Sequence, residues 1–213
     1  MFKIIGVGGQ LANGKDEISD RLAKVLNEDK DTKDYWKRHA FAKSVKEIFL
    51  RTFDKDRDWL EYWKRIDQNP PGFLKNVRQM LIDIGDGFRK MKPDVWIDLI
   101  FRDLDSNLII SDCRYVNEVR YIKEKGGINI LVWREGYLNS LNSPSEQEYV
   151  PYILQLLKAQ QYSSNDTRWM PLEGEIPSNL DIPFDLFIRN EGNLEELYQK
   201  VDNIIVPYIK SKI

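Results

Sequence analysis

Two kinds of hydrophobic pattern alternate along this chain. Short, almost wholly apolar runs predict β-strands at residues 2–7, 107–111, 128–133 and 184–188, and a less apolar run at 35–41 predicts another. Longer segments with apolar residues at helical spacing predict helices, which fall at 16–27, 42–53, 73–88, 93–104, 146–161 and 194–205, with a further one that ends at 125. Because strands and helices alternate, we expect an α/β fold with a mainly parallel sheet and helices on both faces.

The middle third of the chain departs from this alternation. Aromatic residues recur at helical spacing, among them Trp59 and Trp63, and such residues are more often packing residues than a stacking platform for a base. The next helix, at 73–88, is expected to bury Leu74 and to end in Gly85-Asp86-Gly87. We therefore predict a helical segment at 54–104, inserted between two strands.

A second insertion is expected at 137–183, which is rich in Ser, Asn, Pro and Glu and whose pattern is irregular outside one helical stretch. Such a stretch is typical of an insertion or a mobile flap. The chain is nevertheless short enough for one hydrophobic core. We expect residues 1–213 to form a single domain.

The first strand runs into a glycine loop that is followed by a helix. Residues 9–16 read G-x-x-x-x-G-K with Asp where Ser or Thr is usual, which is the Walker A phosphate loop (P-loop). The backbone N–H groups of such a loop curl around phosphate oxygens, and the helix N-terminus adds partial positive charge. We expect an exposed Lys15 to meet the β- and γ-phosphates of ATP. The residues that we assign to ATP here are Gly9, Gln10, Leu11, Ala12, Asn13, Gly14, Lys15, Asp16 and Glu17.

The composition narrows the partners of this loop. The chain has 32 Lys and Arg against 34 Asp and Glu, a net charge of -2, so it lacks the cationic field of proteins that bind duplex nucleic acid. Its single cysteine, Cys113, excludes an internal disulfide framework and fits a reducing compartment. No run approaches the ~18 apolar residues of a membrane span. We expect a cytoplasmic protein with a small ligand and no membrane partner, and the sequence leaves a homodimer open.

Charged residues follow two of the predicted strands, where ligands of open α/β sheets bind. Asp112 and Arg114 come after one strand, and Arg134 follows another. A phosphate loop with such arginines indicates phosphoryl transfer, and a phosphate acceptor, already an oxyanion, needs cationic clamps more than a general base. Glu118, one turn beyond Arg114, is expected to hold the Arg114 side chain. We assign catalysis to Lys15, Arg78 and Arg114, metal binding to Asp16 and Asp112, and substrate contacts to Lys46, Arg78, Asp112, Arg114 and Glu118.

Three stretches together resemble the tailed-phage deoxynucleoside monophosphate kinases. They are Gly14-Lys15-Asp16, the Ser-Asp-Cys-Arg at 111–114 with Glu118, and the Ile-Arg-Asn-Glu-Gly-Asn-Leu-Glu-Glu-Leu at 188–197. The resemblance covers most of the chain, including 41–46 and 78–85. It is poor at 137–183 apart from a Ser-Glu pair at 145–146.

This resemblance implies a P-loop domain of the nucleoside monophosphate kinase type that uses ATP and Mg²⁺. It implies that 54–104 binds the acceptor, with the acceptor phosphate near Lys46, Arg78 and Arg114. It places adenine near Arg134 or the turn at Asn190. If the gene is carried by a bacteriophage, the protein acts in the host cytoplasm.

Two other kinds of function remain open. The Gly-Lys-Asp ending and the Asp-x-Arg element are also similar to animal-type phosphomevalonate kinases, so the acceptor could be another small phosphorylated molecule. A hydroxymethylated base in phage DNA is a further acceptor, although a polynucleotide substrate should bring a basic stripe. A regulatory protein that binds ATP without catalysis belongs to a different class, and Arg78, Asp112 and Arg114 beside Lys15 argue against it.

Overall fold

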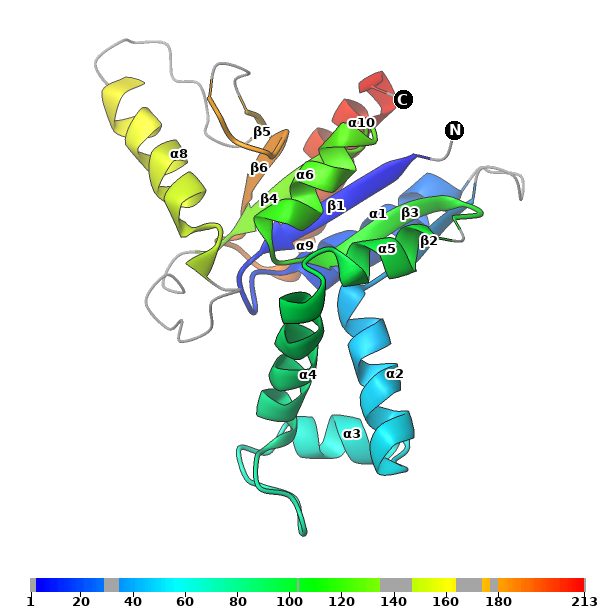
Figure 1. The fold of residues 1–213 in the computed structure, drawn as a ribbon. Helices are drawn as coiled ribbons and strands as arrows, with labels where there is room; N and C mark the ends of the chain where they lie inside the picture. The colour runs from blue at the N-terminus through cyan, green and yellow to red at the C-terminus, as the bar shows by residue number, and fades with distance from the viewer. Residues whose placement is uncertain are drawn as a thin grey trace. The chain divides into compact units, whose positions relative to one another are not determined.

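The computed structural model describes residues 3–28, 35–102, 104–134, 147–163, 174–176 and 180–212. The chain forms two compact units (Figure 1). The sheet unit comprises Met1–His39 and Asp105–Ile213, and the helical unit comprises Ala40–Leu104. The helical unit therefore begins at Ala40, upstream of the segment 54–104 that the sequence pattern indicated.

The sheet unit is built on a mainly parallel sheet. Within the described residues its six strands lie in the order β2-β3-β1-β4-β6-β5. All neighbours are parallel except β5 and β6, which are antiparallel. The strands are β1 (Ile4–Gly9), β2 (Trp36–His39), β3 (Asn107–Cys113), β4 (Ile128–Trp133), β5 (Gly174–Glu175) and β6 (Leu186–Arg189). The expected α/β class is confirmed, and β5 is an edge strand that the pattern did not predict.

Helices cover both faces of this sheet (Figure 1). Alternate residues of β1 point to opposite faces, as in any strand. Ile5 and Val7 are fully buried in a core formed with α1 and the C-terminal helices, whereas a Cβ at Gly6 would meet Ile122 of α6. The helices of the sheet unit are α1 (Lys15–Asn27), α6 (Val116–Glu124), α8 (Val150–Ser163), α9 (Leu194–Lys200), the π-helical turn η2 (Val201–Ile205) and α10 (Val206–Lys212). Residues 135–146 and 164–173, with most of the expected flap and the pair at 145–146, lie outside the described residues.

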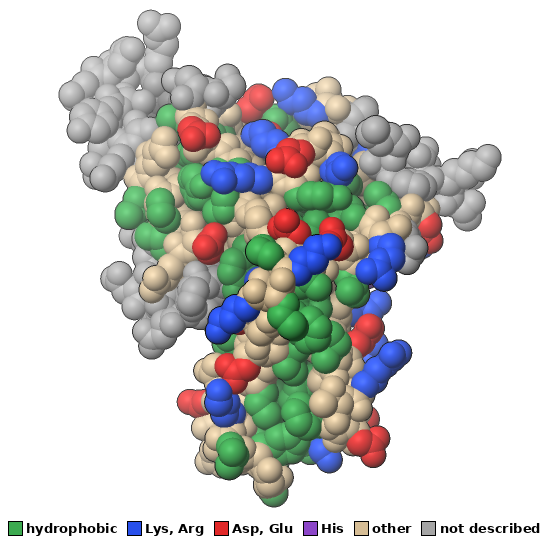
Figure 2. Space-filling model, viewed as in Figure 1, with side chains coloured by type: hydrophobic (Ala, Val, Ile, Leu, Met, Phe, Trp, Pro, Cys, Tyr) green, Lys and Arg blue, Asp and Glu red, His purple; other side chains and the backbone are tan. Residues whose placement is uncertain are grey.

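The helical unit consists of α2 (Phe41–Phe53), α3 (Arg57–Lys64), α4 (Val77–Met91) and α5 (Val95–Phe101). Phe49 stacks on Trp59 and Phe73, with ring centroids 6.1 and 6.5 Å away. These aromatic residues pack as a core, as the sequence pattern favoured. Figure 2 shows hydrophobic side chains gathered along the region of α2 and α4, with charged side chains at its margins.

Two predictions for the segment at 73–88 are wrong. The helix begins at Val77, because the Asn76 side chain accepts a hydrogen bond from the backbone N–H of Gln79 and caps the N-terminus at 2.9 Å, and Leu74 before it is 96% exposed. The helix also continues through Gly85 to Met91. Gly85 is buried there, and its carbonyl accepts a hydrogen bond from the Trp96 indole at 3.1 Å, so tertiary packing offsets the weak helix propensity of glycine.

No helix in the described ranges is long and apolar enough to cross a membrane.

Candidate active site

The phosphate loop joins β1 to α1 in a conformation that requires its glycines. Gly9 and Gly14 have φ of 145° and 90°, values that favour glycine. A Cβ at Gly9 would lie 2.3 Å from the carbonyl oxygen of Val132, and one at Gly14 would lie 2.5 Å from Asn190 Nδ2. The strand, loop and helix that the sequence predicted are all present, and their close packing leaves no room for a side chain at either glycine.

Two asparagines fasten the loop to the neighbouring strands. Asn13 donates through Nδ2 to the carbonyl oxygen of Val132 at 3.1 Å, and Asn190 donates through Nδ2 to the carbonyl oxygen of Asn13 at 3.0 Å. The backbone N–H of Asn190 donates to the carbonyl oxygen of Trp133 at 2.8 Å. Asn190 was expected near adenine, and it lines the cavity described below, but its side-chain amide also supports the loop.

Lys15 is buried rather than exposed, which corrects the expectation from sequence. The residue is 8% exposed, and its Nζ donates to the carbonyl oxygen of Gln10 within the loop. The loop therefore folds over the lysine and holds the ammonium with its own backbone. An oxygen of a bound phosphate would either replace the Gln10 carbonyl oxygen as acceptor for the Lys15 ammonium or bind beside it.

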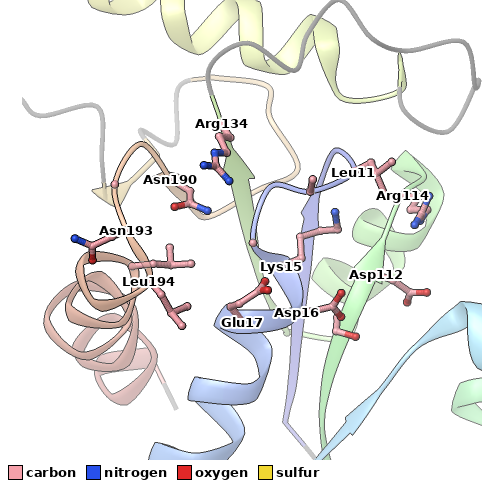
Figure 3. A pocket seen from close by; sticks show the side chains of 15 residues that line it. Leu11, Lys15, Asp16, Glu17, Asp112, Arg114, Arg134, Asn190, Asn193 and Leu194 are labelled. Atoms are coloured by element: carbon pink, nitrogen blue, oxygen red, sulfur yellow. The ribbon is translucent and has the colours of Figure 1, made fainter. Parts of the chain in front are cut away.

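An open cavity of about 580 Å³ lies over the loop (Figure 3). The loop and the start of α1 form one wall, the carboxyl end of β3 contributes Asp112 and Arg114, and the end of β4 contributes Arg134. The turn from Asn190 to Leu194 closes the opposite side. The structure thus brings most of the assigned loop residues together with the two strand ends, because β1 lies between β3 and β4. Gly9, Gln10 and Asn13, which were also assigned to ATP, do not line the cavity.

The carboxylates of this cavity are too few to bind a hard cation alone, and phosphate oxygens would have to complete its ligands. Asp16 and Asp112 both line the cavity, yet among the described residues no cluster of three or more His, Cys, Asp or Glu could hold a metal alone. Mg²⁺ is commonly held by one or two carboxylates together with substrate phosphates. The donor set therefore fits Mg²⁺ delivered with a nucleotide.

Asp16 has a partner that the sequence analysis missed. Its carboxylate forms an ion pair with Arg38 of β2, and the same guanidinium contacts Asp20 at 2.6 Å, one turn further along α1. The Asp16 side chain remains 73% exposed. A charged residue within a predicted strand was the only signal for Arg38. The Arg38 guanidinium partly neutralises the carboxylate of Asp16, which stands where Ser or Thr is usual in this loop.

Glu118 supports the backbone around Arg114. The residue is 2% exposed, and its carboxylate accepts hydrogen bonds from the backbone N–H groups of Arg114 and Tyr115 at 2.7 and 3.1 Å. From the sequence, Glu118 was expected to contact the Arg114 side chain and the substrate. The buried position gives Glu118 the role of positioning the turn after β3.

Lys46 and Arg78, the other assigned substrate contacts, lie in the helical unit. Lys46 Nζ contacts Glu61 Oε1 at 2.7 Å, and Lys64 Nζ contacts the other oxygen of the same carboxylate at 3.1 Å. Arg78 donates through Nε to the carbonyl oxygen of Lys64 at 2.8 Å. Glu61 and Lys64 therefore connect the two assigned residues. Sequence reasoning missed both, since they lie in a charged aromatic helix without a recognisable motif.

The chain was compared with known families, curated proteins and solved structures. No family model and no curated protein matches the chain. Among solved structures, the shikimate kinase of Acinetobacter baumannii in complex with shikimate is 13% identical with a TM-score of 0.43, covering 98% of this chain and 95% of that one. The APS kinase of Mycobacterium tuberculosis in complex with AMPPNP and APS is 11% identical with a TM-score of 0.37, covering 96% of this chain and 98% of that one. These likenesses assign no acceptor to this chain.

Proposed function

We propose that this protein transfers the γ-phosphate of ATP to a deoxynucleoside monophosphate, giving the diphosphate and ADP. The observation that carries the proposal is that the phosphate loop, Lys15, Asp112 and two strand-end arginines line one and the same cavity. Phosphoryl transfer depends mainly on positioning and on neutralising charge, and this cavity supplies cations and N–H donors for both.

In the proposed reaction the loop residues hold the β- and γ-phosphates, with Lys15 facing the negative charge that develops between them. An oxygen of the acceptor phosphate attacks the γ-phosphorus, and the bond from that phosphorus to the bridging oxygen of ADP breaks. Arg114, which lines the cavity, is assigned to the transferred group because its planar fork matches phosphate oxygens. Mg²⁺, when bound with the nucleotide, supplies further charge neutralisation, and Asp16 and Asp112 are the residues that would hold it.

The acceptor phosphate is assigned to Lys46 and Arg78 of the helical unit. A phosphate monoester has a second pKa of ~6, so it is already a nucleophilic dianion near neutral pH. A general base is therefore not required. The resemblance of the sequence motifs supports a deoxynucleotide, and the second candidate is another small phosphorylated acceptor of the phosphomevalonate kind.

The proposal is tested by release of ADP, measured with ATP, Mg²⁺ and each of the four deoxynucleoside monophosphates in turn. Turnover that depends on one of these acceptors is the expected result. Turnover with phosphomevalonate alone would select the second candidate. Binding of ATP without turnover on any acceptor would contradict a kinase and favour a nucleotide-binding regulatory protein.

Lys15→Met is the matching variant. Methionine is unbranched and only one atom shorter than lysine, and it removes the charge, so we expect the variant to fold and to lose a factor of ~10²–10³ in turnover. Circular dichroism and the melting temperature check the fold. Near-normal turnover in a folded Lys15→Met protein would show that this loop does not carry the reaction.

A further inference from the structure

The four residues Lys46, Glu61, Lys64 and Arg78 form a cluster that is charged unevenly. One carboxylate, Glu61, bridges the two lysines of α2 and α3, with its two oxygens at 2.7 and 3.1 Å from their ammonium groups. Arg78 is held on the backbone of Lys64 through Nε, and no described residue gives its guanidinium a carboxylate partner. Three cations and one carboxylate leave two positive charges uncompensated within the cluster.

Partial burial makes this excess costly. The side chains of Lys46 and Lys64 are 32% and 33% exposed. Burial lowers the pKa of the Lys64 ammonium, and neighbouring Lys46 lowers it further, although Glu61 opposes both effects. The hydrogen bond from Lys46 lowers the pKa of the Glu61 carboxyl, so Glu61 carries its full charge at neutral pH. Even a fully ionised Glu61 therefore satisfies these lysines incompletely.

We propose that Lys46 and Lys64 form a binding site for a phosphate dianion, in which Glu61 is the resident counter-ion that the phosphate displaces. The proposal rests on the proposed function, in which the phosphate belongs to the acceptor, and it adds Lys64 and Glu61 to the residues that select it. Arg78 lies beside Lys64 and completes the set of donors.

The charge of the cluster selects this ligand class. A phosphate monoester above its second pKa brings two negative charges and three acceptor oxygens, whereas Glu61 brings one charge and two oxygens. When the phosphate enters, the Glu61 side chain, which is 43% exposed, turns outward and its carboxylate is hydrated by water. The cluster then holds three cations against a dianion, so a monoanionic or neutral ligand is bound less well.

The experiment is a calorimetric titration of the full chain with inorganic phosphate, without ATP. Glu61→Gln removes the competing charge but keeps the shape, so we expect phosphate to bind about tenfold more tightly, equal to ~1.4 kcal/mol. Lys64→Met is expected to weaken binding by about tenfold or more. Lys75→Met is the matched control, because Lys75 forms an ion pair with Asp83 in the same unit at 2.6 Å and should leave phosphate affinity unchanged.

Opposite signs for the two cluster variants identify a displaced counter-ion. An ion pair that only holds α2 to α3 would make both variants weaker binders or leave both unchanged, and either result overturns the proposal. Melting temperatures are recorded first. If Glu61→Gln does not fold, Glu61→Asp replaces it, since a shortened carboxylate reaches both lysines less well and should also tighten binding.

Two further arms separate the ligand sources and the two proposals. A deoxynucleoside monophosphate should follow the same pattern across the variants as inorganic phosphate, while a deoxynucleoside, which lacks the phosphate, should not respond to Glu61→Gln. The phosphate titration contains no ATP and is independent of the turnover assay. Absence of turnover on every acceptor would therefore contradict the proposed function and leave the phosphate affinities of the variants valid. Normal turnover with an unchanged phosphate affinity in Glu61→Gln sinks this inference alone.

Discussion

At the scale of single residues, the cavity depends on pairings between side chains that are distant in sequence. Asp16 is the clearest case, because the same carboxylate faces the cavity and pairs with Arg38 of β2. A carboxylate beside a triphosphate would oppose nucleotide binding unless a cation lies between them. Arg38 and a metal ion are two cations that could serve, and they compete for the same oxygens.

This competition gives a prediction for Mg²⁺ dependence. Asp16→Asn should fold and need much more Mg²⁺ for half-maximal rate. Arg38→Met releases Asp16 and should lower the Mg²⁺ requirement, by no more than about fivefold, because an exposed ion pair contributes only ~0.2–1 kcal/mol. Initial rates against Mg²⁺ concentration measure both effects.

Asp20→Asn is the control for that pair, since Asp20 contacts Arg38 without lining the cavity. It should leave the Mg²⁺ requirement close to that of the unmodified protein. An Mg²⁺ requirement that none of the three variants changes would reduce Asp16 to a residue that stabilises the start of α1.

At the scale of elements, glycines have opposite meanings in the phosphate loop and in α4. Gly14 adopts a φ that other residues avoid and packs against Asn190, so the loop depends on it. Gly87 lies inside a helix, and a Cβ built there meets nothing within 4 Å. The first glycine is required by local geometry, whereas the second only weakens its helix.

Gly87→Ala should therefore stabilise the protein. Alanine loses less conformational freedom in a helix, which is worth ~0.5–1 kcal/mol, and the melting temperature should rise by roughly 2–4 °C per kcal/mol in a chain of this size. Gly14→Ala provides the contrast and should lower both stability and affinity for ATP. A lower melting temperature for Gly87→Ala would mean that α4 is interrupted at the glycines, as the sequence pattern had predicted.

At the scale of the whole molecule, charge is concentrated locally rather than spread. The net charge is only -2, yet charged side chains meet at two places. The cavity over the phosphate loop brings Lys15, Arg114 and Arg134 together with Asp16, Glu17 and Asp112, and the cluster of Lys46, Lys64 and Arg78 surrounds Glu61. Such a distribution suits small anionic ligands better than a long polyanion. Binding at the loop should also stabilise the sheet unit against opening, since a ligand of the native state shifts the unfolding equilibrium.

The rate at which a thiol reagent labels Cys113 would measure that stabilisation. Cys113 is fully buried between Asp112 and Arg114, and burial raises the pKa of its thiol, so reaction with a thiol reagent requires opening of the sheet unit. ATP at a hundred times its dissociation constant should slow the labelling of Cys113 by about 100-fold, equal to ~2.7 kcal/mol. Adenosine, which lacks phosphates, is the matched control. Labelling that is equally fast with bound ATP would contradict a nucleotide site beside β3.

The sequence determined what neighbouring residues can encode. The apolar runs of β1, β3 and β4 and the contiguous loop with its glycines specify backbone conformation locally, so the α/β class and the strand, loop and helix were predicted correctly. The strand ends at Asp112 and Arg134 followed from the same runs, because a parallel sheet brings its carboxyl ends to one edge.

Only the tertiary structure decided which side chains meet. The Asn190 side chain donates a hydrogen bond to the carbonyl oxygen of Asn13, 177 positions away in sequence. Arg38 of β2 forms an ion pair with Asp16 of α1. Glu61 joins Lys46 to Lys64, and packing against Trp96 carries α4 through Gly85. Each of these contacts depends on strand order and helix packing rather than on local propensity, so no periodicity in the chain records it.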